Sequence, residues 1–416
     1  MTAPFDPRID DSRGGWYGAV LTFVALMAPL LGWLSPLGFA PLAALAGLLC
    51  LGAVRAEPRH LPAMVPALVL FSWAAVSIFW TPYRPKNLQS WIALKLVAES
   101  VLYWGVVRAA AQASAASRGR ALTVLAWGMA GLGAILLIEG LTGAFVYQTL
   151  RDALHDPIRP DLARRNVAQG AYVLAIFCAP AALTAWRSGR SWSKYLGLVM
   201  VAGLVAASVA FDADAPVLAV VLALAAGWAV MTWPTAGPRV LAAGAGLFFL
   251  GAPSVILAAK AVGLYDKIHA MAPLSWSERM DYWSHAVRWI GDHPLRGWGI
   301  DSSRSFGPGI VLHPHDGALQ IWLELGVVGA VCAAVFWMAI FLRMCRKKPD
   351  LGVAAGAATG VVYLVFAAVS FGVWQEWWVA LGGLGAAFAF AAELQPARAP
   401  AEAMVKQPST ADPISV

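Results

Sequence analysis

Long apolar stretches recur along the whole chain and are separated by short polar connections. They cover residues 16–36, 38–54, 61–80, 89–108, 121–145, 167–186, 195–212, 215–233, 239–262, 317–342, 351–372 and 376–394. The hydrocarbon core of a bilayer, ~30 Å thick, needs about 20 apolar residues for one helical span. The pattern therefore predicts an all-α polytopic membrane protein with about 12 transmembrane helices.

Composition agrees with this class. Of the 416 residues, 60% are hydrophobic and only 13% are charged, whereas soluble domains have roughly 25% charged residues. A soluble globular domain is therefore excluded, and a disordered chain is excluded by the same hydrophobicity. The net charge is +7, but so few charges cannot form the continuous basic stripe that nucleic acid requires. We expect membrane lipids as partners, and no nucleic acid.

The distribution of Lys and Arg predicts the orientation. If the N-terminus is cytoplasmic, most of the 30 cations fall in cytoplasmic segments, and every inner connection contains at least one. This is the positive-inside pattern. An even number of spans also returns the C-terminus to the cytoplasm, where residues 395–416, rich in Pro, Ala and Ser, are expected to form a disordered tail.

The expected organisation has four parts. Residues 1–262 form transmembrane helices 1–9 with short loops, residues 263–314 form one large periplasmic loop, and residues 315–394 form transmembrane helices 10–12, ahead of the tail. The loop should contain an amphipathic helix at 276–290. Ser275 to Glu278 have the form of a capping box, and the glycine and proline that follow the helix favour its end.

Two arginines of this helix are predicted to lie on opposite faces. At about 100° per residue, Arg279 shares the apolar face with Trp276 and Trp283, whereas Arg288 lies on the face of Asp281 and His285, which should look to water. A charge on a packing face is costly unless it has a partner. Arg279 is thus a candidate for binding an anion, with snorkelling of its side chain as the alternative.

Cations also gather in predicted outer segments, against the positive-inside pattern. Any one of them could be a solvated loop charge. Together they suggest an anion site, because guanidinium forks match phosphate oxygens. A phosphate-bearing ligand at the outer leaflet is the natural candidate. The members of this set are Arg84, Lys86, Arg151, Arg159, Arg164, Arg165, Lys260, Lys267, Arg279, Arg288, Arg296 and Arg304.

A histidine stands directly before the tenth predicted span. Asp316 is suited to cap the N-terminus of that helix, which places His315 at its mouth, near His313. The helix dipole disfavours a protonated imidazole there, although the adjacent Asp316 could raise the histidine pKa. A neutral, accessible histidine is what a general base near pH 7 requires. An ordinary interfacial histidine is the alternative.

Other polar residues within the apolar stretches receive structural interpretations. Lys95 and Glu99, four residues apart, are expected to pair along the fourth span. Glu324 is expected to be a buried structural partner. Asp212 and Asp214 fill a short hairpin, where Asp favours a turn, and a metal site there is the less favoured alternative.

Several motifs together resemble bacterial O-antigen ligases within the O-antigen ligase and polymerase family. Asp316 stands where the family usually has Asn, Ser or Gln. The Ser-Arg-Gly found in many relatives is also absent near residues 211–215. The matching motifs are His315-Asp316 followed after nine residues by Gly326-Val327-Val328-Gly329, the stretch Ser277-Glu278-Arg279…Trp283…His293-Pro294-Leu295-Arg296-Gly297-Trp298-Gly299, and, more weakly, Arg159…Arg165-Asn166.

This resemblance implies glycosyl transfer at the periplasmic face of the bacterial inner membrane. The donor would be O-antigen polysaccharide on undecaprenyl pyrophosphate, and the acceptor a sugar hydroxyl of lipid A–core oligosaccharide. His315 would be the general base of an inverting displacement that needs no metal or other cofactor. The supporting residues would be Asp316 and His313, and the donor pyrophosphate would be bound by Arg279 first, then Arg164 and Arg165, then Arg159, Arg84 and Lys86.

Three other functions remain open. An O-antigen or exopolysaccharide polymerase would use the same donor, and the R-x10-G pattern associated with polymerases occurs here, although about as often as chance predicts. A protein O-oligosaccharyltransferase is a further relative. A transporter of lipid-linked glycan belongs to a different class and would need more intramembrane charges along a path.

Overall fold

The computed structural model describes residues 7–85, 92–191 and 193–395, and this part of the chain is helical, without strands. Nine of its helices are long and apolar enough to cross a membrane. These are α1 (Pro7–Leu34), α3 (Leu61–Val76, with a 3-10 turn at each end), α5 (Ala115–Thr142), α7 (Pro160–Arg187), α9 (Asp214–Thr232), α10 (Ala236–Ala261), α13 (Gly317–Leu342), α14 (Leu351–Val369) and α15 (Glu376–Leu394). The predicted class, an all-α multi-pass membrane protein, is confirmed.

Three further helices complete the apolar bundle. Helices α2 (Phe39–Leu49) and α8 (Lys194–Ala210) are shorter but equally apolar. Helix α4 (Ile92–Gln112) carries Lys95, Glu99 and Arg108 among its apolar residues. Lys95 does not pair with Glu99 as predicted, because its ammonium contacts Glu376 at the start of α15 instead. The packing of α4 on α15 offers Lys95 a partner that the i,i+4 spacing could not reveal.

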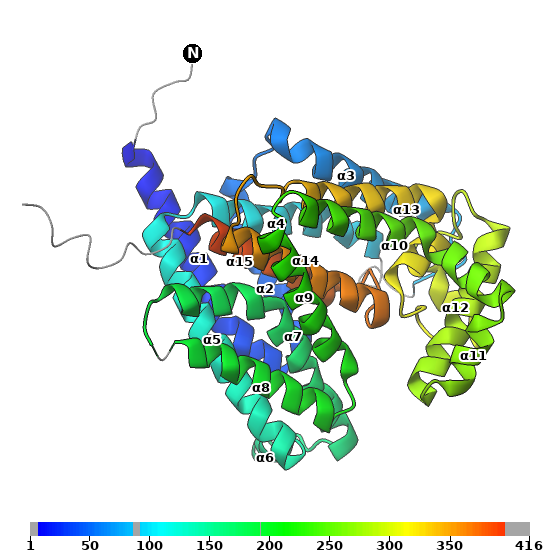
Figure 1. The fold of residues 1–416 in the computed structure, drawn as a ribbon, viewed down its shortest axis with the longest axis horizontal. Coiled ribbons are helices and arrows are strands. Elements are labelled where there is room, and N and C mark those ends of the chain that lie inside the picture. Colours follow the sequence, from blue (N-terminus) through cyan, green and yellow to red (C-terminus); the bar gives the residue numbers. More distant parts are fainter. Residues whose placement is uncertain (1–6, 86–91, 192, 396–416) are drawn as a thin grey trace, which may run out of the picture.

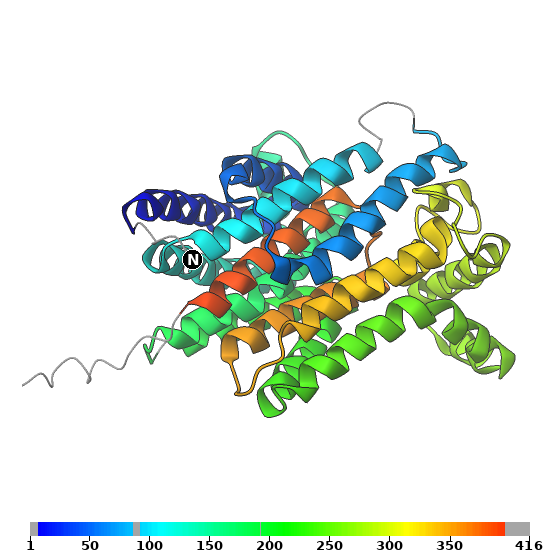
Figure 2. The same ribbon diagram turned by 90° about the horizontal axis from the view of Figure 1, so that it is seen from above.

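The helices form two packed groups. Helices α1, α5, α7 and α8 pack on one another, while α3, α10 and α13 run side by side in a second group (Figure 1 and Figure 2). Helices α14 and α15 join the groups through contacts with α7, α9 and α13. The first and last described helices, α1 and α15, both contact the start of α5, because Ser117 donates to the Gly14 carbonyl oxygen and Arg118 to that of Leu394.

The connection between α10 and α13 forms a cap over one end of the second group (Figure 1). It contains α11 (Leu264–Met271), α12 (Leu274–Asp292) and a 3-10 turn, η6 (Ser302–Ser305). The helix predicted at 276–290 is confirmed, whereas α11 was not predicted. The proposed capping box is wrong, because the N-cap is Pro273, without a side-chain hydrogen bond. Ser275 thus lies inside the first turn.

Helix α13 is broken at Gly326, and a loop fills the break. Gly326 has φ 66° and ψ −160°, a conformation essentially restricted to glycine. The break frees carbonyl groups of the preceding turn, which accept hydrogen bonds from the backbone N–H groups of Trp298 and Gly299. A Cβ atom at Gly297 would lie 2.3 Å from the carbonyl carbon of Glu324. The glycines of the two sequence motifs therefore allow this loop and α13 to pack closely against each other.

Candidate functional site

His315 lies at the start of α13 with its ring held from two sides. Its Nδ1 is 2.9 Å from the carbonyl oxygen of Ser370. Its ring is stacked on that of Tyr282 of α12, with centroids 6.2 Å apart and an interplanar angle of 22°. The backbone at His315 has φ 57°, in the left-handed region that non-glycine residues rarely adopt. Such strain persists only where the surroundings fix it, and here the two ring contacts do so.

These contacts determine the protonation state of the ring. A carbonyl oxygen only accepts hydrogen bonds, so Nδ1 carries the proton and Nε2 retains its lone pair. Burial lowers the pKa of His315, and the charge of Arg279 lowers it further, against the hydrogen bond to Ser370. Near pH 7 the imidazole is therefore neutral, with a basic Nε2.

His313 contacts both the backbone and the ring of His315. Its Nδ1 accepts from the backbone N–H of His315 at 3.2 Å, and the two ring centroids are 4.2 Å apart. Its Nε2 lies 3.3 Å from the amide nitrogen of Gln375. Burial, followed by the influence of His315, Arg304 and Arg279, lowers the pKa of His313 to about 3. His313 is thus a buried neutral group that fixes the backbone at His315.

Asp316 caps α13 as predicted. Its carboxylate accepts from the backbone N–H of Leu319 at 2.9 Å. Burial raises the pKa of Asp316 to about 7, although hydrogen bonds from Leu319 and Ala318 oppose this shift. The expectation that Asp316 raises the pKa of His315 is wrong. The carboxyl group is turned to the helix N-terminus, and the pKa of His315 is lowered.

Helix α12 presents Arg279 towards the histidines. Trp283 of this helix donates to the carbonyl oxygen of Pro314 at 3.0 Å, which ties α12 to the segment before α13. The guanidinium of Arg279 is half-buried and lies 5.1 Å from the ring centroid of Trp276. Arg288 is exposed, so the opposite facing of the two arginines is confirmed. His285 was predicted to face water, but it is half-buried and stacks on Trp289, because the loop around Gly309 covers it.

Sequence reasoning counted Arg304 only among the outer cations, without a specific role, and missed the buried carboxylate of Asp301. Arg304 Nε donates to Asp301 at 3.0 Å, and its charge acts on His313. The backbone N–H of Asp301 donates to the fully buried Glu324, which also accepts from Trp374 and Gln320. The predicted role of Glu324 as a buried structural partner is confirmed. No pattern singled out Arg304 from the other outer cations, because it lies in a loop without periodicity.

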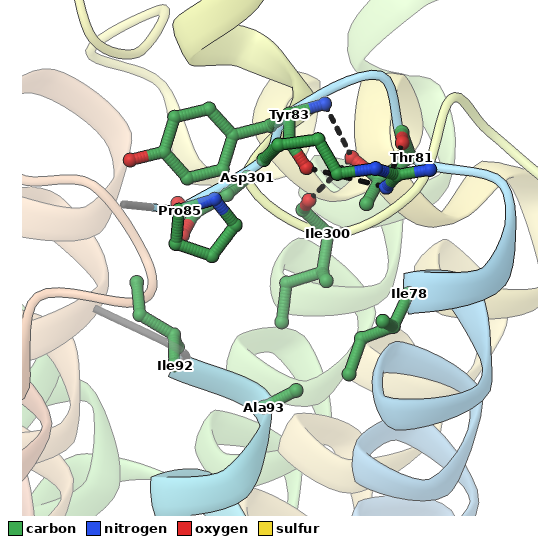
Figure 3. Close-up of a pocket in the computed structure, with 9 residues that line it drawn as sticks. Ile78, Thr81, Tyr83, Pro85, Ile92, Ala93, Ile300 and Asp301 are labelled. Carbon is green, nitrogen blue, oxygen red and sulfur yellow. Dashed lines mark hydrogen bonds between the residues drawn. The ribbon is translucent and has the colours of Figure 1, made fainter. Parts of the chain in front are cut away.

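Two small pockets meet at Asp301. One is lined by residues that include Arg304, His313 and Gln375. The other is mostly apolar and lies between the end of α3, the start of α4 and the Ile300–Asp301 segment (Figure 3). Arg84 lines this second pocket, and its guanidinium donates to the carbonyl oxygen of Thr81 at 2.6 Å. Arg84 is thereby placed on the same side of the bundle as the histidines. Lys86 lies outside the described residues.

The arginines at the start of α7 are exposed. Arg159 is paired with Asp161 at 3.0 Å. Arg165 stands two turns, about 10.5 Å, before Tyr172 on the same face of the helix. Tyr172 packs on Phe371, next to the carbonyl group that holds His315, and lies within reach of the Arg279 charge. This face of α7 is therefore turned to the His315 region. Arg164 lies about 100° away from Arg165.

The segment Asp212–Asp214 forms the tight connection between α8 and α9. Asp212 has φ 53°, and Asp214 is the first residue of α9. The predicted turn is confirmed, since Asp tolerates the left-handed conformation at such positions.

Comparison with known proteins gives matches over this part of the chain. Residues 167–334 match a family model described as O-Antigen ligase, a range that includes Arg279 and His315. A protein of Rickettsia conorii named "Putative polysaccharide ligase" is 26% identical over 133 residues, 29% of this chain and 32% of the relative. A Rickettsia bellii protein of the same name is 28% identical over 137 residues, 28% of this chain and 32% of the relative.

The chain thus spans about a third of the length of these curated relatives. No solved structure gives a significant match. The family match and these relatives support the resemblance to O-antigen ligases over this part of the chain.

Proposed function

We propose that this protein transfers O-antigen polysaccharide from undecaprenyl pyrophosphate to a sugar hydroxyl of lipid A–core oligosaccharide. The reaction takes place at the periplasmic face of the bacterial inner membrane, with both chain termini in the cytoplasm. The observation that carries the proposal is the position of His315. Its Nδ1 is bound to the Ser370 carbonyl oxygen and Tyr282 covers one face of its ring, which leaves Nε2 as a fixed, neutral base.

The chemistry is a single displacement. Nε2 of His315 takes the proton of the acceptor hydroxyl as the oxygen attacks the anomeric carbon of the donor sugar. The bond between that carbon and the pyrophosphate oxygen breaks, and the leaving group departs with the bonding electrons. Attack opposite to the leaving group inverts the anomeric centre. The lipid pyrophosphate is already activated, so the reaction needs neither a nucleotide nor a metal.

The leaving group acquires negative charge, which the surrounding arginines stabilise. Preorganised positive charge of this kind is commonly the largest contribution to catalysis. Arg279 is the leading candidate, because it is half-buried and its charge already acts on His315. Arg165 follows, on the face of α7 turned to the same region, and Arg304 joins the set from the loop. Arg164, Arg159 and Arg84 form the outer part of the proposed donor site, and Lys86 is assigned to it from the sequence alone.

The sequence family also contains polymerases, and one experiment separates the two functions. A deletion strain complemented with this chain or with its His315→Ala variant is analysed for lipopolysaccharide and for lipid-linked polymer. Loss of the O-antigen ladder with accumulation of long lipid-linked polymer supports the ligase. Loss of the long polymer itself contradicts the ligase and supports the polymerase.

A further inference from the structure

At the end of the bundle opposite to His315, several side-chain N–H donors have no acceptor among the residues that the structure describes. This group lies where the 3-10 turn η3 (Pro58–His60) meets the last turns of α4 and the C-terminus of α13. Helix α13 separates this end from His315 by 26 residues, about 39 Å. The group is therefore distinct from the candidate active site.

Arg108 of α4 is the centre of this group. Its side chain is only 6% exposed, and its Nη2 is 2.5 Å from a carboxylate oxygen of Glu57. No described residue accepts a hydrogen bond from its Nε. Its Nη1 lies 3.4 Å from Nε2 of His60. An unpaired buried guanidinium N–H is costly, and the position of the proton on His60 decides whether this contact is a hydrogen bond.

His60 cannot accept that hydrogen bond. Its Nδ1 already accepts from the backbone N–H of Glu57 at 3.2 Å, so the proton of the neutral ring is on Nε2. Trp104 lies one turn before Arg108 and meets His60 edge-to-face, with centroids 5.1 Å apart. Its buried Nε1 also has no acceptor among the described residues. Four N–H groups on three neighbouring side chains thus have no acceptor among the described residues.

Net positive charge surrounds these donors. Among the described residues, Arg59 and Arg108 pair with Glu57, and Arg343 and Arg346 pair with Glu393, so four cations share two carboxylates. Burial lowers the pKa of Arg343, and the charges of Arg346, Arg59 and Arg108 lower it further, against the attraction of Glu393. Arg108 is buried, whereas Arg59 and Arg343 are exposed beside it. An anion would relieve the repulsion among these guanidinium groups and would accept the free N–H bonds.

We propose that Arg108, Trp104, His60 and Arg343 bind the phosphate of an anionic phospholipid headgroup. A lipid fits better than a free anion because lipid-facing apolar side chains adjoin the donors. Leu61 and Val65 of α3 are 47% and 50% exposed, and Leu342 before Arg343 is 46% exposed. Acyl chains would cover these residues while the headgroup enters beside the exposed Arg59. This site is independent of glycosyl transfer.

The test measures phospholipid binding by the purified full chain. Phosphatidylglycerol is titrated into delipidated protein in detergent, with phosphatidylcholine as the zwitterionic comparison, and adducts are counted by native mass spectrometry. We expect selective retention of phosphatidylglycerol. Trp104→Phe keeps the ring and removes one N–H, and Arg343→Gln removes one charge. Each should weaken binding about 10-fold, the effect of losing a hydrogen bond to a charged group.

Matched controls are Trp186→Phe and Arg120→Gln, two exposed positions at the same end of the bundle, which should bind like the wild type. Equal binding of both lipids by the wild type would overturn the proposal. Unchanged affinity in Trp104→Phe and Arg343→Gln would also overturn it, since water would then satisfy the donors. Inorganic phosphate that displaces the lipid at equal concentration would show a free-anion site instead of a lipid site.

Discussion

Replacing Arg279 should nearly silence transfer, whereas replacing Arg288 on the same helix should not. Arg279 is half-buried on the face of α12 that contacts the segment before α13, and its charge acts on His315. A lost contact to the charge developing on pyrophosphate costs about 2–4 kcal/mol, or ~30- to 1000-fold in rate. Arg288 is exposed, and a surface charge contributes at most ~1 kcal/mol.

The pH dependence gives a second signature of the same residue. Arg279 lowers the pKa of His315, so its removal raises that pKa. The base acts only when neutral, so the acid limb of the rate profile should move to higher pH in Arg279→Ala. Arg279→Lys keeps the charge but loses the fork. It should therefore keep the wild-type acid limb while rescuing the rate only partly.

The assay is in vitro ligation with purified protein, lipid-linked donor and O-antigen-free lipopolysaccharide, followed across pH. Arg288→Ala is the matched control, and expression of all variants is compared by immunoblot. An inactive Arg288→Ala beside an active Arg279→Ala would refute the facing of α12 and the donor site built on it. A rate loss in Arg279→Ala without any shift of the acid limb would refute the electrostatic coupling to His315.

Four further outcomes are expected. His315→Ala should abolish transfer at normal expression. Wild-type transfer should persist as pH falls through the ordinary histidine range, because the pKa of His315 is lowered. An acid limb at or above pH ~6.5 would contradict this. Gly326→Ala should destabilise the protein by ~3 kcal/mol or more in thermal unfolding, because the new Cβ would lie 2.4 Å from a carbonyl oxygen. Gly291 has open space around it, so Gly291→Ala is the control that should be tolerated. Transfer should proceed with a chelator and without nucleotide, and activity restored only by a divalent ion would make Asp212 and Asp214 candidate ligands.

The sequence by itself determined the elements and their class. Apolar runs of about 20 residues leave a helical span as the main solution in a bilayer, so the helices followed from local composition. The facing of Arg279 and Arg288 followed as well, because it depends only on the helical repeat within α12. Asp316 was recognisable as an N-cap because capping involves residues three positions apart.

Only the tertiary structure decided which distant groups meet. Lys95 pairs with Glu376, 281 positions away, and Nδ1 of His315 is held by a carbonyl group 55 positions away; no local pattern encodes either contact. The glycine motifs show the same limit. Their spacing was visible, but their reason, the docking of the Pro294–Gly299 loop into the break of α13 at Gly326, arises only when two segments approach within van der Waals distance.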